Sequence, residues 1–288
     1  MAAIRFGLHG INYGPCADPE AAARVARAAE EAGFESVWTA EHVVLPDPRV
    51  PPSPMHPDQP ILDPLTPLAY LAARTTRLRL ATGIIILPQR NPLVLAKEAA
   101  SVDVLSGGRL ILGVAAGYLE PEFRALGAPF EGRGPRTVEY IAAMRAIWSE
   151  QRPASFSGRF VRFEGISARP LPVQRPGPPI VMGGHSPMAL RRAVQHANGW
   201  YGWALDLDGA TRCIEGLHAA MERYGRPAEL GPLEISVTPR GEVTPETVER
   251  YAALGVHRLV LILPPRAGVD DLERFIAETA RTLIGATG

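Results

Sequence analysis

The sequence predicts a closed (β/α)8 TIM barrel, an α/β fold, as a single domain over residues 1–288. Apolar runs begin near residues 4, 36, 78, 109, 180, 199, 233 and 257, and segments with apolar residues at helical spacing separate them. Continuous apolar runs are typical of parallel strands that are buried on both faces. Eight such units, in a chain of 288 residues that is 46% hydrophobic, fit one closed barrel better than an open sheet.

The first units carry clear helix signals. Residues 4–10 predict a strand, and Asp18-Pro19-Glu20 predicts the start of the first helix, because Asp accepts hydrogen bonds at a helix cap and Pro suits the first turn. Gly33 is expected to end that helix, and residues 36–39 predict the second strand. The second helix is expected from Pro64 onward.

The clearest βαβ unit follows. Apolar runs at residues 78–87 and 110–116 predict two parallel strands. The helix between them carries its apolar residues at helical spacing: Leu95, Ala99, Val102 and Leu105. The next helix is expected where Val138, Ile141 and Trp148 share a face.

The second half repeats the pattern. Strands are expected at residues 180–182, 199–202, 233–237 and 257–263, each with an amphipathic helix after it. Thr244-Pro245-Glu246 predicts a helix start, and Gly255 its end. The inner positions of the other three helices are Leu190, Ala193 and Val194, then Ile214, Leu217 and Met221, and finally Leu272, Phe275, Ile276 and Leu283.

Two segments interrupt the alternation. Residues 43–62 are too rich in proline for the interior of a helix or a sheet, so they predict a long loop. Such a loop is either a lid or binding element, or poorly ordered. Residues 151–179 predict an insertion in the barrel, with a hairpin around Gly158 and no core of its own.

Composition excludes several classes of protein. The formal charge is zero, and there is no basic run, so a nucleic-acid surface is not expected. No segment approaches about 20 uninterrupted apolar residues, so a membrane span is not expected. Cys16 and Cys213 lack metal-binding spacing, and no metal site is expected. A cytoplasmic, reduced protein is the expectation, since the first residues lack a signal-peptide pattern.

In a barrel of this kind, the active site lies at the carboxyl ends of the strands. That rule selects His9, the pair Glu41-His42, residues 82–84, residues 115–118, residues 182–186 and residues 200–203.

Two of these segments carry specific chemistry. Gly183, Gly184, His185 and Ser186 precede a helix and would let its N–H groups bind a phosphate, but an ordinary turn with a serine cap explains them equally well. His42 is either a proton donor or an ordinary loop histidine. Glu120 and Glu122 either face the mouth of the barrel or, as is expected, are solvated loop carboxylates. Trp200 and Trp203 either line a site for a flat ring or, as is expected, pack in the core.

Four segments in order resemble the bacterial luciferase-like superfamily, and within it the oxidoreductases that use the deazaflavin coenzyme F420. They are SVWTAEHVVLP, TGIIILPQRNPLVLAKEAASVDVLSGGRLILGVAAGY, the SGRFVRF hairpin and PPIVMGGHSPMALRRAVQHANGWYGW. The similarity runs from about residue 4 to residue 203.

The resemblance implies a set of roles. The bond between Gly83 and Ile84 matches a non-proline cis peptide that supports the deazaflavin ring in members of the family. Residues 183–186 match the loop that binds the cofactor phosphate, and Glu41-His42 matches a pair that contacts the ring or supplies a proton. The resemblance thus makes His42 and Glu41 the catalytic candidates. The assigned cofactor contacts are His9, Thr82, Gly83, Ile84, Gly117, Met182, Gly183, Gly184, His185 and Ser186.

The chain departs from the family pattern at two positions. Ala116 stands where several users of flavin mononucleotide (FMN) carry a phosphate-binding arginine, which favours F420. Tyr118 stands where sugar-phosphate dehydrogenases carry a catalytic glutamate, which argues against a sugar phosphate substrate; whether Glu120 replaces that glutamate stays open.

Three functions follow as alternatives. The first is hydride transfer between F420 and a small organic substrate, the second an FMN-dependent two-component monooxygenase, and the third a flavin-binding barrel without turnover. A homodimer is expected, because family members commonly dimerise through barrel helices. A flavin or F420 reductase is a further expected partner.

Overall fold

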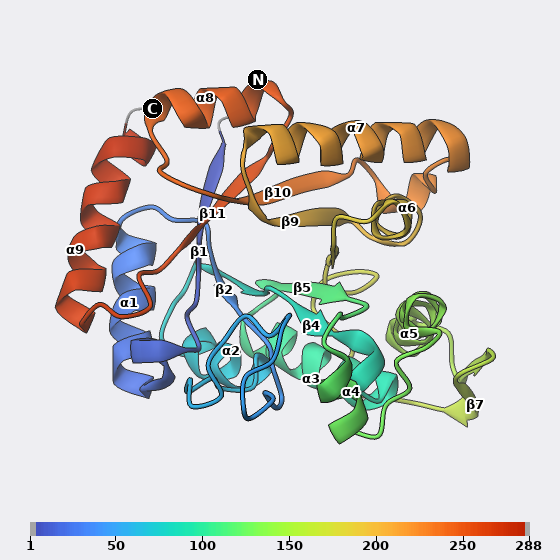
Figure 1. Cartoon of the computed structure of the whole chain (residues 1–288). Helices are drawn as coiled ribbons and strands as arrows, with labels where there is room; N and C mark the ends of the chain where they lie inside the picture. Colours follow the sequence, from blue (N-terminus) through green and yellow to red (C-terminus); the bar gives the residue numbers. More distant parts are fainter. Residues whose placement is uncertain (1–3, 286–288) are drawn as a thin grey trace.

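The computed structural model describes residues 4–285, and these residues form the expected barrel (Figure 1). All the strand pairings within it are parallel, and β3 pairs with β5 to close the sheet. Around the barrel the strands follow the order β3-β2-β1-β11-β10-β9-β8-β5. Their bounds are β1 Arg5–His9, β2 Ser36–Thr39, β3 Arg79–Thr82, β5 Leu110–Ala115, β8 Ile180–Gly183, β9 Gly199–Leu205, β10 Glu234–Pro239 and β11 Arg258–Ile262.

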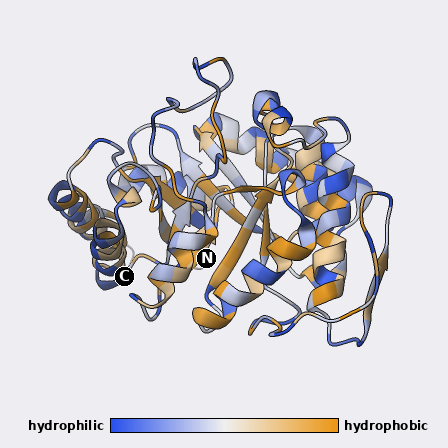
Figure 2. Cartoon of the chain, turned by 90° about the horizontal axis from the view of Figure 1, so that it is seen from below, coloured by the Kyte–Doolittle hydropathy of each residue, from blue (hydrophilic) through white to orange (hydrophobic). Residues whose placement is uncertain are grey.

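Helices cover the outside of the barrel. In Figure 2 the strands are largely hydrophobic, and the helices show hydrophobic and hydrophilic faces. The helices are α1 Pro19–Glu31, α2 Leu65–Ala72, α3 Pro92–Leu105, α4 Glu120–Ala125, α5 Arg133–Trp148, α6 Pro187–His196, α7 Leu207–Tyr224, α8 Pro245–Ala253 and α9 Val269–Thr279. In the described part of the chain, no helix has the length and apolar character needed to cross a membrane.

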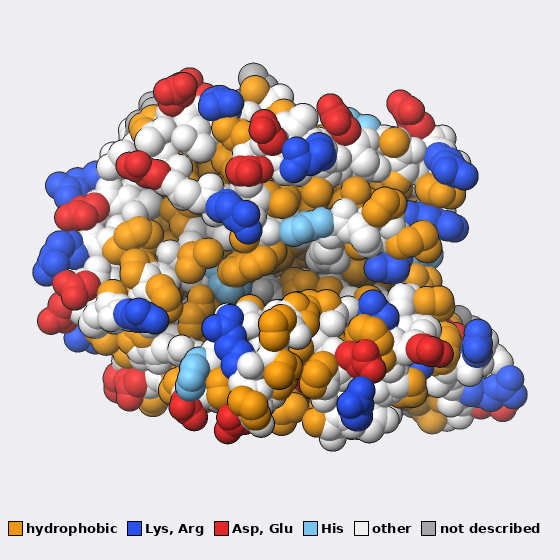
Figure 3. Space-filling view, viewed as in Figure 1, with side chains coloured by type: hydrophobic (Ala, Val, Ile, Leu, Met, Phe, Trp, Pro, Cys, Tyr) orange, Lys and Arg blue, Asp and Glu red, His pale blue; other side chains and the backbone are white. Residues whose placement is uncertain are grey.

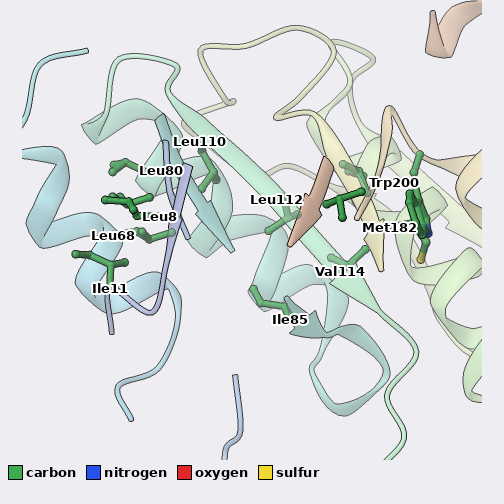
Figure 4. Close-up of a cluster of buried hydrophobic side chains, with 14 of the residues drawn as sticks. Leu8, Ile11, Leu68, Leu80, Ile85, Leu110, Leu112, Val114, Met182 and Trp200 are labelled. Atoms are coloured by element: carbon green, nitrogen blue, oxygen red, sulfur yellow. The ribbon is translucent and has the colours of Figure 1, made fainter. Parts of the chain in front are cut away.

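The core has two layers, because successive strand residues face opposite sides of the sheet. The larger layer lies between the strands and the helices and includes Leu8, Leu80, Leu112 and Met182 (Figure 4). The smaller layer fills the barrel interior with Trp38, Ala81, Ile111, Val181, Tyr201 and Val260. The barrel is therefore a packed core, and its chemistry is confined to its ends.

A charged cluster closes the amino-terminal end of the barrel. Arg258 on β11 has no exposed surface, and its guanidinium binds Glu35, Glu234 and Ser236. Burial alone would raise the pKa of Glu35, but its hydrogen bonds to Arg258 and the charge of that arginine outweigh burial and lower the pKa. The carboxylates are thus held ionised in the fold.

The third strand is broken where the resemblance placed its special peptide bond. β3 ends at Thr82, the bond between Gly83 and Ile84 is cis as expected, and the chain resumes as the two-residue strand β4, Ile85–Ile86. Gly113 on β5 lies against this break, and a Cβ there would collide with the carbonyl oxygen of Thr82. Glycine at 113 therefore lets the two chains approach.

Both interrupting segments follow the expectation. The insertion contains an antiparallel hairpin, β6 Ala154–Ser157 and β7 Arg162–Ile166. The proline-rich loop forms no helix or long strand. Asn12 donates to the carbonyl oxygens of Ala40, which precedes the loop, and of Leu62, its last residue. One element was not expected: α4 lies within the loop that follows β5.

Candidate active site

His9 ends β1 at the carboxyl end of the barrel and is almost completely buried. Its Nε2 lies 2.9 Å from the carbonyl oxygen of Gly83, so Nε2 carries the proton and donates. Burial lowers the pKa of His9 to about 4, which keeps the ring neutral. Its Nδ1 is buried and has no hydrogen-bond partner among residues 4–285. A ligand with an N–H or O–H donor would satisfy this acceptor.

The neutral His9 predicts a pH-dependent stability. The unfolded chain binds a proton at His9 below about pH 6.5, whereas the fold binds it only near pH 4. The neutral His9 therefore contributes fully to the stability of the fold above pH 6.5. As the pH falls toward 4 this contribution is lost, and the free energy of unfolding decreases by about 3 kcal/mol. In His9→Gln the amide can still donate to Gly83 but does not titrate. We expect its free energy of unfolding, measured by urea titration, to depend less on pH between 4 and 6.5 than that of the wild type.

The matched control is His218→Gln, a change at an exposed histidine of α7. It should reproduce the pH dependence of the wild type. A His9→Gln profile parallel to the wild-type profile would contradict a neutral His9.

His42 lies beside Glu122 rather than beside its sequence neighbour. Its Nδ1 is 3.2 Å from Oε2 of Glu122, and its Nε2 is 3.5 Å from the hydroxyl of Tyr118. The His42 side chain is only 7% exposed, and that of Glu122 1%. The expectation that Glu122 is a solvated loop carboxylate is wrong, because α4 turns it inward next to buried Phe123.

Glu41 has different partners. Its carboxylate accepts from the backbone N–H of Ile86 and from the guanidinium of Arg90, and Arg90 also pairs with Asp63. Burial raises the pKa of Glu41, and the charge of Arg90 opposes this shift. These contacts connect β4 to the end of β2, so Glu41 supports the backbone around the site. Its catalytic role remains a prediction.

The glycine loop after β8 forms a serine-capped turn, and its binding of a phosphate stays a prediction. Ser186 caps α6, with its Oγ accepting from the backbone N–H of Ala189, as an ordinary turn would. Gly184 has a φ of +117°, which favours glycine. Nε2 of His185 accepts from the backbone N–H of Trp203 at 3.1 Å, so this loop is joined to the end of β9.

Three other predicted contact residues have structural tasks. Thr82 donates its hydroxyl to the carbonyl oxygen of Gly113 at 2.8 Å. Met182 lies in the outer core layer with no exposed surface. Gly117 has a φ of +81°, and a Cβ there would press on Ile86 and Phe123. Their contact with a cofactor stays a prediction.

Arg133 is a residue at the site that the sequence did not indicate, and Trp203 differs from the expectation that it packs in the core. Trp200 is buried as expected, but Trp203 is 41% exposed, and its ring centroid lies 4.5 Å from that of His9. Arg133, at the start of α5, donates to the carbonyl oxygen of Gly117 at 3.0 Å. A guanidinium therefore lies next to Ala116, although the strand itself supplies none.

The surface in Figure 3 is hollowed near its centre, and hydrophobic and histidine side chains edge the hollow. Within residues 4–285, no group of three or more His, Cys, Asp and Glu side chains is arranged to hold a metal ion. The described side chains at the carboxyl end are thus aromatic and histidine rings, the buried His42–Glu122 pair, the Glu41–Arg90 ion pair and the guanidinium of Arg133.

Comparison with known proteins identifies a family and two relatives. The sequence model of luciferase-like monooxygenases matches residues 2–282. An uncharacterised protein of Mycobacterium tuberculosis is 31% identical over 271 residues, which cover 91% of this chain and 93% of that protein. An FMNH2-dependent dimethylsulfone monooxygenase of Pseudomonas putida is 31% identical over 164 residues, 56% of this chain and 45% of that protein.

The fold is also that of an F420 enzyme of known structure. The coenzyme F420-dependent tetrahydromethanopterin reductase of Methanopyrus kandleri superimposes with a TM-score of 0.79 over the whole of both chains, at 19% sequence identity. This likeness shows a shared fold.

Proposed function

Since this chain belongs to the luciferase-like monooxygenase family, a family of oxidoreductases and monooxygenases that act on small molecules, we propose that it transfers a hydride between coenzyme F420 and a small organic substrate. The observation that carries the proposal is the buried His42–Glu122 pair beside Tyr118 at the barrel mouth. Hydride transfer to or from a carbon that bears oxygen is accompanied by a proton at that oxygen. A positioned imidazole is the side chain best suited to exchange that proton near neutral pH.

The residues of the mouth fit a ring cofactor. The unpaired Nδ1 of His9 is a buried acceptor for an N–H or O–H of a ligand. Trp203 gives the mouth a partly exposed aromatic surface beside it. Gly83 and Ile84 would support the ring, and the N–H groups at the start of α6 would bind phosphate. F420, when bound, supplies the hydride chemistry.

The side chains of the protein then have defined tasks. His42 accepts or returns the proton at the substrate oxygen through Nε2, the nitrogen that is not directed at Glu122. Tyr118, 47% exposed, is placed to hydrogen-bond the same oxygen. Glu41 and Arg90 hold β4 against the end of β2 and so keep the mouth in shape.

One observation favours a second function, an FMN-dependent monooxygenase. Ala116 argues against a phosphate-binding arginine on the strand, but the guanidinium of Arg133 reaches the next residue from α5. In the described part of the chain, Arg133 pairs with no carboxylate; its Nε and Nη1 donate to the carbonyl oxygens of Gly117 and Phe130, and its Nη2 is left to bind an anion. An arginine at this place would serve an FMN phosphate as well as an F420 phosphate.

Binding of the two cofactors decides between these functions. We expect F420 to bind at least about tenfold more tightly than oxidised or reduced FMN when both are titrated into the purified protein under nitrogen, with fluorescence and absorbance as readouts. A protein that retains reduced FMN and takes up oxygen, but fails to bind F420, would establish the monooxygenase instead.

A further inference from the structure

The carboxylate of Glu122 is buried without a cationic side chain. It is 1% exposed, and no arginine or lysine pairs with it among the described residues. Its Oε1 accepts from the backbone N–H groups of Val43 at 2.7 Å and Val44 at 3.4 Å. Its Oε2 lies 3.2 Å from Nδ1 of His42. A buried carboxylate must be hydrogen-bonded, and within residues 4–285 its partners are these three groups.

This arrangement fixes the tautomer of His42. An ionised carboxylate only accepts hydrogen bonds, so Nδ1 must carry the hydrogen. In the neutral ring Nε2 then keeps its lone pair, and Nε2 is the nitrogen that lies near the hydroxyl of Tyr118. The ring is therefore an acceptor on the side of the mouth and a donor on the side of α4.

The same carboxylate also fixes the backbone that carries His42. Val43 and Val44 begin the proline-rich loop, residues 43–62, and both donate to one oxygen of Glu122. The anchor is rigid because Phe123, the next residue, has no exposed surface and packs its ring 5.3 Å from that of Phe130. Ring orientation and loop start thus depend on a single side chain from a different element.

We propose that Glu122 is a positioning residue, which holds His42 in the Nδ1–H tautomer with its Nε2 lone pair turned toward Tyr118 and the substrate. The purpose of this role rests on the proposed function, in which Glu122 prepares His42 to take a proton. Its geometry stands independently of which cofactor binds. It also specifies the substrate as one that releases or gains a proton at a heteroatom beside Tyr118.

The test is the tautomer of His42 in the full chain without cofactor. Protein labelled with ¹⁵N-histidine is examined by two-bond ¹H–¹⁵N correlation spectra at about pH 8.5, where an ordinary histidine is neutral. The signals of His42 are assigned as those that disappear in His42→Gln. We expect the Nδ1–H pattern in the wild type.

Glu122→Gln is the informative variant. Its amide oxygen can still accept from Val43 and Val44, while its NH2 group donates toward Nδ1, so the ring is expected to change to the Nε2–H tautomer. With a compound that F420 turns over, kcat is expected to fall about 10²-fold or more with KM little changed, because the lone pair is lost from Nε2. Glu122→Asp keeps a carboxylate, and where this shorter side chain reaches Nδ1 of His42 the Nδ1–H pattern should be retained.

Glu120→Gln is the matched control. Glu120 lies on the same helix but is exposed and pairs with Arg124, so this change should leave the His42 signals unchanged. An Nε2–H pattern in the wild type, or an unchanged pattern in Glu122→Gln, would overturn the proposal. A protein that shows the expected tautomer but binds no F420 would retain the positioning role and lose the proposed function, so the two failures are distinguishable.

Discussion

Replacing His42 with glutamine is expected to lower kcat by about 10²–10⁴-fold, the usual contribution of a general acid or base. Glutamine retains much of the size of the ring and can still donate to Glu122, but it cannot exchange a proton near neutral pH. Turnover is measured by the absorbance of F420, with the compound that the wild type turns over fastest from a panel of small alcohols and carbonyl compounds. The dissociation constant for F420 should change less than threefold.

His56→Gln provides the control for this experiment. His56 lies in the proline-rich loop, where its side chain is 67% exposed and pairs with Asp58. Its replacement should leave kcat unchanged. If His42→Gln retained more than a tenth of the wild-type kcat, His42 would not be the residue that exchanges the proton.

The second large effect concerns stability at the other end of the barrel. Arg258→Met is expected to lower the free energy of unfolding by about 3–5 kcal/mol, because it leaves Glu35 and Glu234 partly buried with Arg5 as their remaining cationic partner. Urea titrations at pH 7 measure the loss. The loss should shrink as the pH falls below about 4.5, since the pKa values of both carboxyls are lowered in the fold and their stabilisation disappears when they are protonated.

An exposed arginine is the comparison for Arg258→Met. Arg274 is 65% exposed and pairs with Asp271 three residues earlier on α9. Arg274→Met should change the free energy of unfolding by less than about 0.5 kcal/mol. A loss below about 1 kcal/mol for Arg258→Met would show that the cluster contributes little to the fold.

The fold was predictable because its signals are local. Each barrel strand is a short run of apolar residues, and helix starts such as Asp18-Pro19-Glu20 satisfy their own N–H groups, so neither requires knowledge of distant residues. The break after Thr82 came from the family resemblance and not from periodicity. Local patterns do not show that residue 113 must be glycine, because the atom that a Cβ would meet, the carbonyl oxygen of Thr82, lies on a different strand.

The site was less predictable because its partners are far apart in sequence. His42 and Glu122 are separated by 80 positions, and nothing in the spacing of either shows that they meet. Two weak signals were present. A charged residue in an apolar strand, such as Arg258, must be paired. An acidic residue next to a buried aromatic one, such as Glu122 beside Phe123, can be turned inward. Trp203 lies within β9, and the pattern alone could not show whether it packs in the core or faces a ligand.

The most direct test of a deazaflavin site at the barrel mouth is a titration that shows both which cofactor binds and where. F420 is titrated into the wild type, Trp203→Ala and Tyr224→Ala, with FMN in parallel. We expect the wild type to prefer F420. Of the two variants, only Trp203→Ala should weaken F420 binding, by about tenfold, because Trp203 lies beside His9 at the mouth, whereas Tyr224 ends α7. Tighter binding of FMN, or equal F420 affinity in all three proteins, would contradict a deazaflavin site at this mouth.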